Sequence, residues 1–107
     1  MKRVLVVNGD IEQCLALSDF LGEFGFETAV ASDREKMFRE LEAADPLPDA
    51  ILLDLEMPNS EGWKIREELI AHPKYKSISL IVISSDDDLI QPFQTPNMDS
   101  VLLGALN

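Results

Sequence analysis

Short apolar runs alternate along this chain with segments of helical periodicity, and this alternation limits the fold more than any other feature. Four runs, at residues 4–7, 26–31, 50–53 and 79–83, are mostly apolar. Continuous apolar runs are typical of strands that are buried on both faces of a parallel sheet. Helical segments between such strands form right-handed βαβ units. The pattern therefore predicts an α/β fold with a parallel sheet and helices on both of its faces.

Helix-start signals follow the first two of these strands. Asp10 with Gln13, and Ser32 with Glu35, have the spacing of capping boxes, in which the first side chain caps the helix and the second reaches back. We therefore expect helices to begin directly after residues 10 and 32. A third helix is expected over residues 62–71.

The composition is that of one globular domain, residues 1–107, with 46% hydrophobic residues and a mean hydropathy near zero. Twenty acidic side chains against nine basic ones give a net charge of −11, which disfavours nucleic acid and anionic membranes as partners. Cys14 is the only cysteine, so no intrachain disulfide can form, and we expect a cytoplasmic protein. Because Cys14 lies on the apolar stripe of the first helix, we expect it in the core.

Polar residues follow three of the predicted strands. In parallel α/β sheets the functional site lies beyond the carboxyl ends of the central strands. This rule selects Asn8-Gly9-Asp10, Asp54 with its loop, and Ser84-Ser85-Asp86. A carboxylate at one strand end beside a hydroxyl at the next suits attack on phosphorus to give an aspartyl phosphate. Such a transfer also uses Mg²⁺ held by carboxylates, and a Lys or Arg on the phosphoryl oxygens.

Residues 49–62, Asp-Ala-Ile-Leu-Leu-Asp-Leu-Glu-Met-Pro-Asn-Ser-Glu-Gly, strongly resemble the phosphoacceptor segment of response-regulator receiver domains, in which an acceptor Asp is followed by Met-Pro and then by Gly. The resemblance implies that Asp54 is the phosphoacceptor, that Glu56 offers its backbone carbonyl to the metal, and that Ser84 binds a phosphoryl oxygen. It extends through the fifth strand. The implied fold is flavodoxin-like, a doubly wound parallel sheet of five strands in the order 2-1-3-4-5.

The end of the chain departs from that family fold. A fifth strand is expected at residues 99–103, and the space between Asp86 and Pro92 allows only a short fourth helix. Four residues follow the fifth strand, so the last helix is missing, and Val101 and Leu103 would face water. Exposing several such side chains costs about 1.5 to 3 kcal/mol each. We therefore expect self-association, or docking of a partner protein, at this face.

The site also departs from the family pattern. Receivers carry two adjacent acids directly after the first strand, where this chain has Asn8 and Gly9. They also carry a Lys at the end of the fifth strand, whereas no Lys or Arg follows Lys76 here. We therefore expect weak or absent Mg²⁺ binding and impaired phosphotransfer. The remaining candidate metal ligands are Asp10, Asp54 and the backbone carbonyl of Glu56.

Three functions remain open. The leading hypothesis is a non-enzymatic receiver-like domain of a two-component phosphorelay that acts mainly through contacts with a histidine kinase or another signalling protein. One alternative is a fully active Mg²⁺-dependent receiver, phosphorylated on Asp54 by a histidine kinase. The other is a haloacid-dehalogenase-like phosphatase, because Asp54-Leu55-Glu56 and Ser84 echo two of its motifs, although its later Lys is missing. Two local roles compete with these: Asp10 can be a helix N-cap, and Ser84 can bond within a turn.

Overall fold

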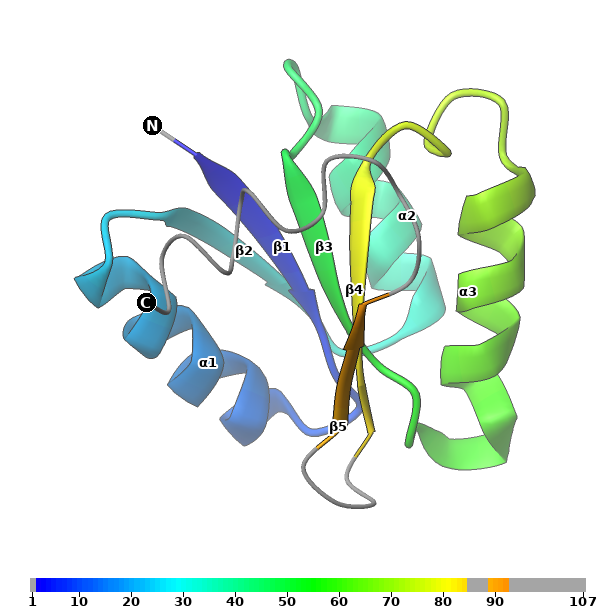
Figure 1. Cartoon of the computed structure of the whole chain (residues 1–107), viewed down its shortest axis with the longest axis horizontal. Helices are drawn as coiled ribbons and strands as arrows, with labels where there is room; N and C mark the ends of the chain where they lie inside the picture. The colour runs from blue at the N-terminus through cyan, green and yellow to red at the C-terminus, as the bar shows by residue number, and fades with distance from the viewer. Residues whose placement is uncertain (1, 85–88, 93–107) are drawn as a thin grey trace.

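The predicted alternation of strands and helices is present in the computed structural model, which describes residues 2–84 and 89–92. The elements are β1 (Arg3–Val7), α1 (Ile11–Glu23), β2 (Glu27–Ala31), α2 (Arg34–Ala43), β3 (Ala50–Asp54), the 3-10 turn η1 (Pro58–Ser60), α3 (Glu61–Ala71), β4 (Ser79–Ser84) and β5 (Leu89–Pro92). The sheet lies between α1 on one face and α2 and α3 on the other (Figure 1). Each helix in the described part of the chain falls short of the length and apolar content that a membrane span needs.

The sheet has the strand order β2-β1-β3-β4-β5. The first four strands run parallel, and their register aligns Val7 with Ala31 and Leu53, and Leu53 with Val82. The carboxyl ends of these four strands therefore reach the same edge of the sheet. This arrangement confirms the predicted flavodoxin-like α/β fold and the order of its first four strands.

The fifth strand differs from the prediction. A short fourth helix is predicted between Asp86 and Pro92, but Leu89–Pro92 form β5, which pairs antiparallel with β4. The helix prediction is wrong at these residues because Pro92 disfavours a helical backbone at Gln91. A proline is also tolerated in an edge strand, where one side of the backbone needs no ladder hydrogen bond.

Some predictions concern parts of the chain outside the described residues. The parallel strand expected at residues 99–103 is one of them. The argument for self-association through an uncovered face rests on Val101 and Leu103, which also lie outside the described residues. Self-association therefore stays a prediction.

Two hydrophobic clusters, one on each face of the sheet, form the core. Successive side chains of a strand point to opposite faces, and both faces of β1 and β3 are covered, so both strands are apolar nearly throughout. Cys14, on the inner face of α1, is buried against the sheet, as predicted. The α1 cluster also contains Val4, Val6, Leu21, Phe26, Ala50, Leu52 and Ile81. The larger cluster, under α2 and α3, includes Leu5, Val7, Met37, Leu41, Ile51, Leu53, Ile65 and Leu69.

Both predicted helices begin with an N-cap residue, but the second N-cap lies one residue later than predicted. α1 begins after Asp10, whose Oδ1 accepts a hydrogen bond from the backbone N–H of Glu12 at 2.9 Å. α2 begins after Asp33 rather than after Ser32, and Asp33 Oδ1 accepts from the backbone N–H of Lys36 at 2.8 Å. A carboxylate at this position also interacts favourably with the positive end of the helix dipole. The second helix therefore starts one residue later than predicted.

An ion pair joins α2 to α3. Arg34 Nε donates to Glu68 Oε1 at 2.6 Å, and Nη2 donates to Oε2 at 2.5 Å, so the contact is bidentate. Hydrogen bonding to Arg34 lowers the pKa of Glu68 below its ordinary value of 4.5. The two side chains are 48% and 37% exposed, so water screens much of their attraction.

We predict that Glu68→Gln lowers the free energy of unfolding by at most about 1 kcal/mol at pH 7, as expected for an exposed pair. Because folding lowers the pKa of Glu68, the stabilisation is complete above the unfolded-state pKa and is lost as the pH falls through the folded-state pKa. Urea unfolding at pH 7, 5 and 3.5 measures this dependence. Glu42→Gln, an exposed α2 substitution, serves as the control. A difference between wild type and Glu68→Gln that stays constant with pH would contradict the prediction.

Candidate functional site

Asp54 ends β3 at the carboxyl edge of the sheet, and its side chain is half-buried. Its Oδ1 accepts a hydrogen bond from the backbone N–H of Glu56 at 2.8 Å, which fixes the carboxylate against the following turn. Asp54 pairs with Ile83 of β4, so Ser84 lies one residue further along the neighbouring strand. The structure therefore brings the backbones of Asp54 and Ser84 to the same edge, as predicted.

The loop after Asp54 packs tightly against the start of α3. A Cβ atom on Gly62 would lie 2.5 Å from the backbone oxygen of Asp54 and 2.6 Å from the Cα atom of Leu55, so only glycine fits there. The turn before it holds Asn59 and Ser60 at φ of 60° and 58°, in the left-handed region. Because Gly62 allows this approach, α3 begins directly against the backbone that carries Asp54.

Asn8 is a buried polar side chain at the end of β1. Val7 pairs with Leu53, so Asn8 is level with Asp54 on the adjacent strand. Asn8 Oδ1 accepts from the backbone N–H of Asp10 at 2.9 Å, and Nδ2 donates to Gln13 Oε1 at 3.5 Å. In the predicted capping box, the side chain of Gln13 accepts from the backbone N–H of Asp10. In the structure, the side chain of Asn8 accepts this hydrogen bond instead.

Asp10 is exposed and caps α1, which confirms the local role weighed for it above. Its carboxylate and that of Asp54 both act on the thiol of Cys14. Burial is the main cause that raises the pKa of Cys14, and the two negative charges raise it further. Asp10 follows β1 and Asp54 ends the neighbouring strand β3, so both residues lie at the carboxyl edge of the sheet.

The loops after β1 and β3 approach each other at Gly9. A Cβ on Gly9 would lie 3.2 Å from Pro58 Cδ, so the loop after β1 meets the loop after β3. Within the described ranges, no three Asp, Glu, His or Cys side chains come together as a group that could hold a metal ion. Glu56 is exposed on the loop beyond Asp54.

Trp63 lies beside this loop on the first turn of α3 and is 50% exposed. It borders an open hollow of about 380 Å³. Since Trp63 is the only tryptophan of the chain, its fluorescence reports on the loop that follows Asp54. The hollow is lined by Leu55, Glu56, Met57, Pro58, Ser60 and Trp63.

A family model for the response regulator receiver domain matches residues 4–102. The chain belongs to this family. Among curated relatives, the transcriptional regulatory protein PrrA of Mycobacterium tuberculosis is 32% identical over 104 residues, which cover 85% of this chain and 44% of PrrA. Receiver domains are signalling modules of two-component systems, and this membership, rather than the phosphatase alternative, accounts for Asp54-Leu55-Glu56.

Two solved receivers share the fold of this domain. The chemotaxis response regulator CheY4 of Vibrio cholerae has a TM-score of 0.74 at 20% identity, with 98% of each chain covered. The response regulator TrrA of Thermotoga maritima, solved in complex with Mg(2+)-BeF, has a TM-score of 0.71 at 24% identity, covering 99% of this chain and 97% of TrrA. The chain spans between 6% and 44% of the length of the curated relatives it matches.

Sequence reasoning places Asp54 correctly at the carboxyl end of a central strand, but it misses the hydrogen bonds of Asn8. A polar residue directly after a buried strand is the available signal, because a buried amide needs partners for its donors and acceptor. The side chain of Ser84 lies outside the described part of the structure, so its predicted contact with a phosphoryl group stays a prediction.

We predict that Gly62→Ala destabilises the domain by at least about 2 kcal/mol, because its methyl group would overlap backbone atoms that have no room to move. Gly22→Ala is the matched control. A Cβ at Gly22 in α1 has no neighbour within 4 Å, so this change should stabilise the domain by about 0.5 to 1 kcal/mol. Urea unfolding followed by circular dichroism measures both. Equal stability of the two variants would contradict the described contact.

Proposed function

We propose that this receiver domain signals mainly through contacts with other proteins and that phosphotransfer to Asp54 is impaired. The observation that carries the proposal is Asn8, a neutral amide level with Asp54 at the end of β1. Asn8 is 5% exposed and is hydrogen-bonded to Asp10 and Gln13, so its side chain is buried and held in place by these two residues. The charge that two family acids would add at this edge is absent at both Asn8 and Gly9.

The donor set supports weak or absent Mg²⁺ binding. Mg²⁺ is held by one or two carboxylates in a near-octahedral shell of oxygens. Here one oxygen of Asp10 caps α1, and one oxygen of Asp54 accepts from Glu56. These two carboxylates and the Glu56 carbonyl are the remaining candidates, and loss of a ligand or of its support lowers metal affinity by about ten- to a hundredfold.

The sequence also supports a slow transfer step. A cation that neutralises the transferring phosphoryl group contributes several powers of ten in rate, about 10³ to 10⁵ in phosphoryl-transfer enzymes. Residues 77–107 contain no Lys or Arg, so the fifth strand predicted at residues 99–103 is followed by Gly104 and Ala105 and not by the lysine of receivers. Fewer charges around Asp54 also mean less repulsion within the unphosphorylated domain, which allows the fold to keep Asp54 without the rest of the site.

The partner that best suits this proposal is a histidine kinase or another protein of a two-component pathway. The proposal rests on family membership for the class of partner and on Asn8 for the weakened chemistry. A fully active receiver is the competing function, because Asp54 keeps its strand-end position and Asp10 follows the adjacent strand at the same edge of the sheet.

The test compares wild type with Asn8→Asp, which keeps the shape of the side chain and restores one acid. Both are incubated with acetyl phosphate over a Mg²⁺ series, and the intact mass is measured. We expect Asn8→Asp to gain one phosphoryl group at Mg²⁺ concentrations about ten- to a hundredfold lower than wild type requires. Trp63 fluorescence, titrated with Mg²⁺ alone, gives the metal affinity of both proteins independently of the transfer step.

Asp54→Asn, alone and combined with Asn8→Asp, is the control and should remove the added mass. Phosphorylation of the wild type at the same Mg²⁺ concentration as Asn8→Asp would refute the impaired reading and support the active receiver. An added mass that persists in Asp54→Asn would refute Asp54 as the acceptor.

A further inference from the structure

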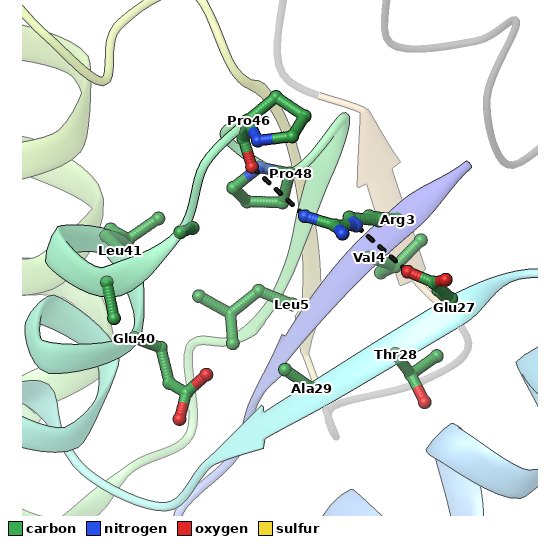
Figure 2. A pocket seen from close by; sticks show the side chains of 12 residues that line it. Arg3, Val4, Leu5, Glu27, Thr28, Ala29, Glu40, Leu41, Pro46 and Pro48 are labelled. Carbon is green, nitrogen blue, oxygen red and sulfur yellow. Dashed lines mark hydrogen bonds and ion pairs between the residues drawn. The ribbon is translucent and has the colours of Figure 1, made fainter. Parts of the chain in front are cut away.

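A second concave site lies at the opposite edge of the sheet from Asp54. It is a cavity of about 330 Å³ between the first residues of β1 and β2 and the end of α2 (Figure 2). Cavities of about 300 to 1,000 Å³ that are mostly apolar, with a few polar groups, are the usual size and character of small-molecule sites. The lining residues are Arg3, Val4, Leu5, Glu27, Thr28, Ala29, Glu40, Leu41, Ala43, Ala44, Pro46 and Pro48.

Small side chains line much of the cavity between β2 and the end of α2, among them Ala29, Ala43 and Ala44. Leu5 pairs with Ala29 in the sheet, and both side chains face α2. Ala29 of β2 and Leu41 of α2 both line the cavity, and α2 ends beside it at Ala43. The floor is therefore apolar, with Ala29 partly exposed above the buried Leu5 and Leu41.

Arg3 and Glu27 form the polar rim. They are directly paired across β1 and β2, and Arg3 Nε donates to Glu27 Oε1 at 2.9 Å. Arg3 Nη1 also donates to the backbone oxygen of Pro46 at 3.3 Å, so the guanidinium bridges the mouth from β2 to the loop before β3 (Figure 2). Arg3 is thus held by acceptors on both sides of the opening.

The remaining charge of the lining is negative. Arg3 is the only basic lining residue and is paired with Glu27, whereas Glu40 adds a second carboxylate. The cavity also borders the carboxyl end of α2, the negative end of its dipole, and no basic residue lies in the last turn of that helix. The lining thus combines an apolar floor with negative charge near Glu40.

We propose that this cavity binds small organic cations, with an apolar body against Leu5, Ala29 and Leu41 and a positive head near Glu40 and the end of α2. An anionic head would face Glu40 and compete with Glu27 for Arg3. The proposal is independent of phosphotransfer, because none of the lining residues belongs to the Asp54 edge.

The experiment uses three probes that share a benzyl or phenyl body and differ in head group: benzylamine, benzyl alcohol and benzoate. Each is titrated into the full chain, and amide chemical shifts are followed by NMR. We expect saturable shifts centred on Leu5, Ala29 and Leu41, with a dissociation constant for benzylamine on the order of 1 mM. Benzyl alcohol should bind about three- to fivefold more weakly, and benzoate more weakly still.

Two variants separate the apolar and the charged contributions. Ala29→Leu fills the floor without changing any charge and should abolish binding of both benzylamine and benzyl alcohol, whereas Ala16→Leu, the same change at an exposed position of α1, should leave binding unchanged. Glu40→Gln, at an exposed position, should reduce the affinity for benzylamine to that for benzyl alcohol and leave the alcohol unaffected.

Several results would overturn the proposal. The first is the absence of saturable shifts around Ala29 with all three probes. Equal affinities for benzylamine and benzyl alcohol would refute the preference for a cation, and unchanged binding by a folded Ala29→Leu would refute the cavity as the site. If circular dichroism shows that Ala29→Leu does not fold, the comparison of wild type with Glu40→Gln decides the outcome, because Glu40 is exposed and its substitution leaves the core intact.

Discussion

Burial of β1 and β3 on both faces is the constraint on which the rest of this structure depends. Residues in these strands have no solvent-facing side, so polar groups can occur only where the strands end. Parallel pairing then brings the ends of β1, β3 and β4 to one edge. Asn8 and Asp54 lie level with each other at this edge, because the preceding positions of both strands are buried in the apolar core. The same geometry leaves Arg3 and Glu27 at the opposite edge, where β1 and β2 begin.

The parts of the fold that the sequence predicts are those in which local signals and burial agree. Apolar runs give four parallel strands, and Asp10 caps α1 where its spacing places it. The error at residues 89–92 arises from a short segment in which Pro92 disfavours a helical backbone and pairing with β4 stabilises the extended one. The shift of the second cap from Ser32 to Asp33 has a similar origin, since two adjacent residues can both cap a helix.

The candidate site divides in the same way. The position of Asp54 follows from a strand end and from the Met57-Pro58 and Gly62 spacing, all of which are visible in the sequence. The bonds of Asn8 depend on which neighbours fold against it, so they cannot be derived from spacing alone. The cavity bounded by Ala29 also escapes prediction, because it is defined by atoms that are missing between two elements rather than by a motif.

The contact at Gly62 makes the segment between Asp54 and α3 a spacer of fixed length. The start of α3 is in van der Waals contact with the Asp54 backbone. Residues inserted into this segment would have no free space and would displace α3 from the sheet. The connection between α2 and β3 lies at the opposite edge of the sheet, where Arg3 Nη1 donates to the backbone oxygen of Pro46. Natural or engineered insertions should therefore avoid the segment after Asp54, and its length should change little.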